Sequence, residues 1–86
     1  MEKVIEVEFR VTWRLPVFIR IGNGFRERID GPDAALQALL HRWPASSPSE
    51  YAVAKRRCAV AISNQGSPDL ARNAFVEAAV AAKVLA

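Results

Sequence analysis

The sequence predicts an α+β domain in which an antiparallel β-hairpin precedes three helices and the last helix is central. Three observations lead to this fold class. Apolar and polar residues alternate along the first part of the chain, as they do in a half-buried strand. Pro32, Pro48 and Pro68 each open a helix-forming stretch, and proline is favoured at the first helical position. The stretch from 68 to 85 is rich in alanine and has no glycine.

The alternation in the first part of the chain is longer than one compact domain can hold straight. Every odd-numbered residue from Ile5 to Ile21 is apolar, and most even-numbered ones are polar. Seventeen residues in one strand would span about 56 Å, whereas a domain of this length has a radius of gyration of about 12 Å. Either the chain bends near Pro16, which cannot donate to a ladder, or its first half pairs elsewhere.

The turn of the hairpin is predicted at Gly22–Gly24. A two-residue loop would mix the faces of the two strands, so parity favours a three-residue loop with Gly24 at positive φ. The returning strand is then Phe25–Ile29, and the sheet has two or three strands. This register sets three pairs of residues opposite each other: Val17 and Ile29, Phe18 and Arg28, Arg20 and Arg26.

The first two helices are predicted at 32–43 and 48–63. Ser47 and Glu50 form a capping box at the start of the second helix, and Gly66 ends it in a left-handed conformation. Helical spacing turns one set of side chains of each helix inward. These sets are Leu36, Leu39, Leu40 and Trp43, and then Tyr51, Ala54, Cys58, Ala61 and Ile62.

The last helix is predicted to begin after the N-cap Ser67 and to run to Leu85. One face of it carries Ala71, Ala74, Phe75, Ala78, Ala82 and Leu85. Val76, Val80 and Val84 make a second side apolar. A helix that is apolar nearly all round is buried on more than one side, so the other elements should pack around it.

Composition indicates a single globular domain over residues 1–86. The chain is 51% hydrophobic and 24% charged, with a formal net charge of +3. The single cysteine, Cys58, excludes an internal disulfide and suits a reducing compartment. Glu2 and Glu6 interrupt the apolar run that a signal peptide needs, and no stretch is long enough to span a membrane. We therefore expect a cytoplasmic protein without membrane contact.

No set of residues in the sequence is typical of catalysis, and we expect neither enzymatic activity nor a cofactor. A metal site needs several converging ligands, but the chain has one histidine, His41, and one cysteine, Cys58. Glu6 and Glu8 share a strand face, which is not the dry cleft of acid–base chemistry. The glycines at Gly22–Gly24 precede a strand, whereas phosphate loops precede a helix. The feature that would reverse this expectation is a ligand cleft among Trp13, Trp43 and Tyr51.

Two surfaces are candidate binding sites. The first is the even-numbered face of the hairpin, where a weak anion or single-stranded nucleic-acid site would consist of Phe18, Arg20, Arg26 and Arg28. Arg10 and Arg14 extend the same face. The second is apolar and needs burial, which favours a homodimer or another protein partner. Its residues are Ile5, Val7, Phe9, Val11, Val76 and Val80.

Motifs along most of the chain resemble a known family. They are Trp13, Pro16-Val17, Gly22 and Gly24, Ile29, Pro32, Ala35 and Leu39, then Trp43-Pro44, Tyr51, Ala54, Cys58, Ala71-Arg72, Ala74-Phe75 and Ala78-Ala79. The pattern resembles domain of unknown function 982, found in small proteins of rhizobia and related alphaproteobacteria. The resemblance covers residues 13–85 and leaves 1–12 as an N-terminal strand extension. It implies a shared fold, and no activity, cofactor or catalytic residue.

Overall fold

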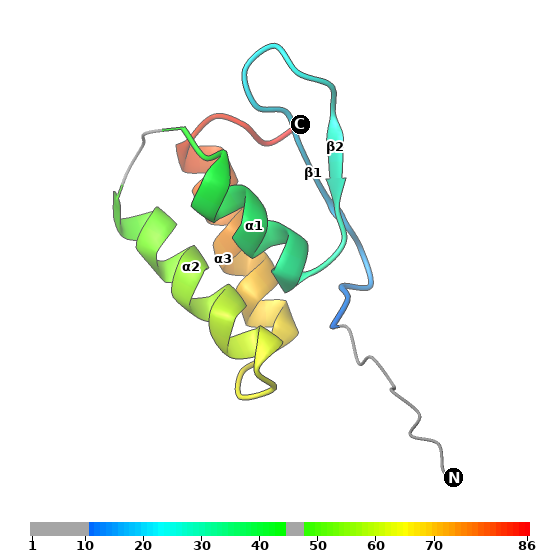
Figure 1. Cartoon of the computed structure of the whole chain (residues 1–86), viewed down its shortest axis with the longest axis vertical. Coiled ribbons are helices and arrows are strands. Elements are labelled where there is room, and N and C mark those ends of the chain that lie inside the picture. Colours follow the sequence, from blue (N-terminus) through cyan, green and yellow to red (C-terminus); the bar gives the residue numbers. More distant parts are fainter. Residues whose placement is uncertain (1–10, 45–47) are drawn as a thin grey trace, which may run out of the picture.

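The computed structural model describes residues 11–44 and 48–86, in which two short antiparallel strands precede three helices (Figure 1). The strands are β1 (Val17–Ile19) and β2 (Glu27–Ile29), and the helices are α1 (Pro32–His41), α2 (Pro48–Ile62) and α3 (Pro68–Ala81). None of the helices in these residues is long and apolar enough to cross a bilayer. The predicted α+β class and element order are confirmed.

The hairpin has the predicted register but is shorter than predicted. Val17 lies opposite Ile29, and Phe18 lies opposite Arg28. The ladder ends at Ile19 and Glu27. The predicted pairing of Arg20 with Arg26 is therefore wrong, and Phe25 and Arg26 lie outside β2.

The turn between the strands also differs in its details. The residue at positive φ is Gly22 (φ 62°) and not Gly24, whose N–H donates to the carbonyl of Ile21 over 3.1 Å. Phe25, predicted as the first residue of the returning strand, is 96% exposed. Beyond the three paired positions, the alternation of the sequence therefore does not continue as a sheet face.

The chain's last residues form a third strand-like segment that the sequence did not predict. Helix α3 ends at Ala81 rather than Leu85, because Lys83 turns the backbone at φ 61°. The N–H groups of Lys83 and Val84 donate back to the carbonyls of Val80 and Ala79, as in a Schellman motif.

After this turn, the C-terminal tail runs antiparallel to β1. Ile19 bridges to Leu85, the Arg20 N–H donates to the Val84 carbonyl over 2.7 Å, and the Ala86 N–H donates to the Phe18 carbonyl over 2.9 Å. Consequently β1 lies between β2 and the tail, with both of its edges paired (Figure 1).

The chain bends just before β1, as one of the two sequence-based alternatives required. The bend is at Arg14 and Leu15. The guanidinium of Arg72 donates to the carbonyls of Leu15, over 2.8 Å, and Pro16, over 3.4 Å. Further back, the Trp13 N–H donates to the Asp30 carbonyl over 2.7 Å. The remaining part of the predicted strand, residues 1–10, lies outside the described residues.

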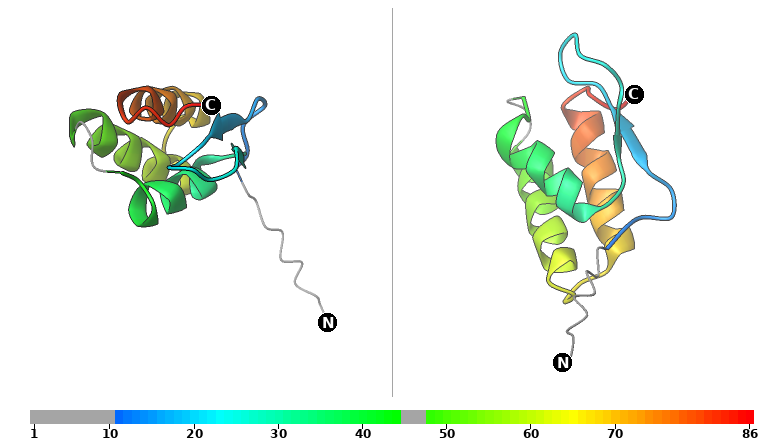
Figure 2. Two further views of the ribbon diagram at one scale, coloured as in Figure 1. Left: turned by 90° about the horizontal axis from the view of Figure 1, so that it is seen from above. Right: turned by 45° about the vertical axis from the view of Figure 1, so that its right-hand side comes forward.

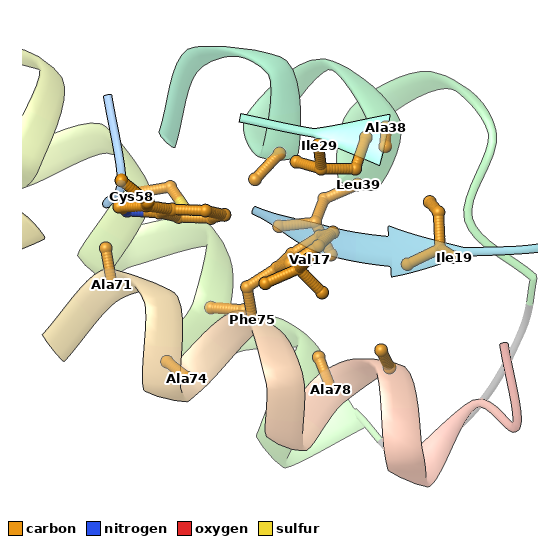
Figure 3. Packing of buried hydrophobic residues seen from close by; sticks show 14 of the residues in the cluster. Val17, Ile19, Ile29, Ala38, Leu39, Cys58, Ala71, Ala74, Phe75 and Ala78 are labelled. Carbon is orange, nitrogen blue, oxygen red and sulfur yellow. The ribbon is translucent and has the colours of Figure 1, made fainter. Parts of the chain in front are cut away.

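The core lies between the sheet and the three helices, and α2 packs against both α1 and α3 (Figures 1 and 2). Phe75 is fully buried and points from α3 toward the sheet and α1 (Figure 3). Its ring centroid lies 5.9 Å from that of Trp13 and 5.4 Å from that of Trp43. Around it, the facing sides of the helices are lined by small residues: Ala35, Ala38, Ala54, Cys58, Ala61, Ala71, Ala74, Ala78 and Ala79.

Some predicted helix details are confirmed and others are wrong. The Ser67 hydroxyl accepts from the Leu70 N–H over 3.2 Å, so Ser67 is the N-cap of α3. Leu40 and Ile62, predicted inward, are exposed because they flank the buried stripe of their helices. The residue at positive φ after α2 is Asn64 (φ 65°) and not Gly66. The predicted capping box includes Ser47, which lies outside the described residues.

We predict that Gly31→Ala lowers the free energy of unfolding by about 1–3 kcal/mol. The backbone of Gly31 is extended (φ −171°), so the constraint is steric and not conformational. A Cβ there would clash with the carbonyl oxygen of Val11 and lie 3.2 Å from the Cα of Thr12. Urea denaturation measures the change.

The control for this prediction is Gln37→Ala on the exposed side of α1, which should change the unfolding free energy by less than about 0.5 kcal/mol. Equal stability of the Gly31→Ala variant and the wild type would show that the N-terminal segment does not lie against Gly31.

Candidate functional site

The predicted anion face lies on the solvent side of the hairpin, and its arginines have different surroundings. The guanidinium carbon of Arg26 lies 4.4 Å from the centroid of the Phe18 ring. This is a cation–π contact, which holds the charge over one face of the ring. The Nε of Arg28 donates to Asp30 Oδ1 over 2.7 Å, which offsets its charge. The structure therefore brings Phe18, Arg26 and Arg28 together, with an acidic residue among them.

Arg20 lies apart from these three residues in its contacts. Its backbone pairs with the C-terminal tail, and its side chain is exposed. Within residues 11–44 and 48–86 we find no side-chain partner for it. An anion at this face would thus meet Arg20 and Arg26 first, because Arg28 is already paired.

The strongest ion pair of the hairpin was not predicted. Both terminal nitrogens of Arg42, just after α1, donate to the two carboxylate oxygens of Glu27 in β2, over 2.7 and 2.8 Å. The hydrogen bonds from Arg42 lower the pKa of Glu27, and those to Glu27 raise the pKa of Arg42. No sequence signal relates these residues, because only the packing of α1 against the hairpin brings them together. The ion pair holds β2 against the C-terminal end of α1.

The predicted self-association residues are only partly described. Ile5, Val7 and Phe9 lie outside the described residues. Val11 is half-buried beside Gly31. On α3, Val76 is half-buried against the core and Val80 is 58% exposed. Val84, the third member of the predicted stripe, is buried at the turn after α3. Of the α3 residues in this set, Val80 is the one whose side chain is mostly free to meet a partner.

A groove lies between α2 and the start of α3. It encloses about 360 Å³. Its apolar residues are Val53, Val60 and Leu70, and Arg56 and Arg57 contribute its positive charge. The i, i+3, i+4, i+7 spacing of the α2 residues could have identified this face. The contribution of Leu70 depends on how the loop after α2 folds back.

The described residues contain no arrangement typical of catalysis. They hold no cluster of three or more potential metal ligands. Cys58 is fully buried, and burial raises the pKa of its thiol to about 12, so the nucleophilic thiolate is not formed near neutral pH. Trp13 and Trp43 both pack on Phe75, and the Tyr51 hydroxyl donates to the Leu39 carbonyl over 2.8 Å. Trp13 also lines a hollow with Pro68 and Asp69 at the start of α3, and neither Trp43 nor Tyr51 lines that hollow.

Comparisons with known proteins agree with this fold. Residues 15–86 match the model of the family described as "Protein of unknown function (DUF982)". The NMR structure of the Agrobacterium tumefaciens protein Atu1219, a structural genomics target, is similar with a TM-score of 0.77 and 30% sequence identity. The similarity covers 99% of this chain and 86% of that one. No curated protein matches the chain.

We predict that Glu27→Gln lowers the unfolding free energy at pH 7 by less than about 1 kcal/mol, because both partners of the ion pair are partly exposed. The pKa of Glu27 is lower in the folded state than its ordinary value of 4.5. The stabilisation is therefore present above the unfolded-state pKa and is lost as pH falls through the folded-state pKa. Urea denaturation at pH 7 and pH 3 measures it.

The control is Glu77→Gln on the exposed side of α3, which removes the same charge away from the ion pair and should change the unfolding free energy at pH 7 by less than about 0.5 kcal/mol. Wild type and Glu27→Gln should differ less in unfolding free energy at pH 3 than at pH 7. An equal difference at both pH values would contradict the ionic origin of the effect.

Proposed function

The chain belongs to the DUF982 family of proteins of unknown function, and within that family we propose that it is a non-enzymatic interaction module that self-associates as a homodimer in the cytoplasm. The observation that carries the proposal is the apolar face of the N-terminal segment, Ile5, Val7, Phe9 and Val11. A face of this kind is stable only when it is covered.

The described sheet limits how this face can be covered. β1 is paired on both edges, with β2 and with the C-terminal tail, so the N-terminal segment cannot add to β1. In residues 11–44 and 48–86, the open positions are the outer edges of β2 and of the tail, and the surface of the helices. A second copy can provide each of these, and a short chain gains stability from such an association.

Exposed apolar side chains on the described surface are a second support. Leu15, Phe25, Leu70 and Val80 are each at least half exposed. Single exposed apolar residues are common, and these four lie at the bend, in the hairpin turn and at the two ends of α3, so each adds apolar area that a partner can cover.

We predict that the full chain is a dimer at micromolar concentration and that Val7→Asp combined with Phe9→Asp makes it a monomer. Charged side chains on the apolar face would have to be desolvated in the interface. Sedimentation equilibrium measures the mass of both proteins.

The control is Thr12→Asp combined with Arg14→Asp, which adds the same side chains at exposed even-numbered positions and should leave the dimer intact. A monomeric wild-type chain, or a dimer that tolerates the two apolar-face changes, would overturn the proposal.

The alternative function is weak binding of an anion or a single-stranded nucleic acid. It is supported by the contact of Arg26 with Phe18 and by the exposure of the Arg20 side chain. An aromatic ring with arginines around it can stack a base while the guanidinium groups meet phosphates. The pairing of Arg28 with Asp30 reduces the available charge and makes this the second candidate.

If this alternative holds, an oligonucleotide should bind with an affinity that falls as salt concentration rises, and Arg20→Ala with Arg26→Ala should abolish the binding. Fluorescence anisotropy at two salt concentrations is the measurement. Arg56→Ala with Arg57→Ala removes the same charge from α2 and serves as the control. If both double variants lose oligonucleotide affinity equally, the binding depends on the overall charge of the protein and not on a site on the hairpin.

A further inference from the structure

The groove between α2 and α3 is lined by apolar side chains and by two arginines, Arg56 and Arg57. Val53, Val60 and Leu70 form the floor, and Leu70 is 50% exposed. Arg56 and Arg57 are exposed, and neither has a carboxylate partner in the described part of the chain. The groove therefore fits a segment that presents apolar side chains and acidic ones together.

We propose that this groove binds the N-terminal segment of a second copy of the chain, residues 2–9, so that the two copies exchange their segments. The proposal rests on the self-association proposed above and names its site. The segment has the matching composition: Ile5, Val7 and Phe9 alternate with Glu6 and Glu8. Glu2 adds acidic charge, which Lys3 partly offsets.

The dimensions of the two partners agree. An extended chain from Ile5 to Phe9 spans about 13 Å. Val53 and Val60 lie about 10 Å apart along the axis of α2, and Leu70 adds to the floor from α3. The arginine side chains are long enough to raise their guanidinium groups from the groove to the outward-facing glutamates. Electrostatic complementarity of this kind fixes the register of a bound segment.

The start of the described chain favours a second copy over the same chain. Val11 lies against Gly31, and the Trp13 N–H bonds to Asp30, so this segment runs beside the start of α1. The groove lies between α2 and the start of α3. Thr12 and Trp13 line a hollow with Pro68 and Asp69, so within one molecule the segment would have to pass around the first turn of α3 to reach Leu70. A second molecule can approach the groove directly.

The test is charge reversal in the full chain, read by sedimentation equilibrium. Arg56→Glu with Arg57→Glu, and separately Glu6→Lys with Glu8→Lys, should each weaken the dimer about tenfold, because two attractive pairs become repulsive. The chain with all four changes should recover an affinity within about threefold of the wild type. Arg14→Glu with Lys83→Glu makes the same charge change at exposed positions outside the groove and should leave the dimer unchanged.

Each outcome decides a different point. If both double variants weaken the dimer and the variant with all four changes restores its affinity, the result supports binding of the segment in the groove. A wild-type dimer that tolerates the Arg56 and Arg57 changes overturns the groove as the site and leaves self-association standing. If both double variants weaken the dimer and the variant with all four changes does not restore its affinity, the pairing of the glutamates with these arginines is overturned. A wild-type monomer overturns both proposals. A thermal melt followed by circular dichroism verifies that every variant is folded.

Discussion

The packing of Phe75 between two tryptophans is the contact on which the rest of the structure depends. Phe75 comes from α3, Trp13 from the segment before β1, and Trp43 from the end of α1. These rings join the N-terminal segment, the first helix and the last helix at one point. The indole N–H groups of both tryptophans are buried without an acceptor in the described residues. For each tryptophan, the unpaired buried N–H costs about 1–3 kcal/mol, but burial of about 200 Å² of its aromatic surface contributes about 5 kcal/mol. Packing therefore outweighs the unpaired donors.

The alanines around this cluster explain how so short a chain buries it. Small side chains on the facing sides of α2 and α3 let the two helices approach closely, so Phe75 and Cys58 fill the space without long neighbours. The use of alanine in the core also affects the surface of the protein. Alanine stripes bury little area per residue, and much of the larger apolar surface is left outside, at Leu15, Phe25 and Val80. A core built in this way is compatible with a chain that completes its stability through a partner.

The sequence predicted those features that depend on neighbours in the chain. Proline at the first helical position, Ser67 as N-cap and the parity of the hairpin register are all local, and the structure has them. The missed features join distant segments: the tail beside β1, the Glu27–Arg42 pair and the bonds from Arg72 to the bend. The tail beside β1 could not be predicted because the turn before it is made by Lys83 at positive φ. A glycine at that position would have indicated the turn, but a lysine does not. Of the candidate anion site, the sequence predicted the Phe18–Arg28 pairing but could not predict which arginines are already paired.

The C-terminal tail changes what the N-terminal segment can do. The sequence predicts an apolar first half of the long strand that either folds back within the chain or pairs elsewhere. With Val84 and Ala86 bonded to β1, one edge of β1 is occupied by the chain itself. An apolar face that cannot be buried against β1 needs either an outer strand edge or a groove. The edges of β2 and of the tail are only a few residues long, which limits the number of main-chain bonds that an added strand can make. The groove between α2 and α3 offers apolar area and charge instead. The folding of the last residues onto β1 is therefore the reason why the proposed interaction is with the helices.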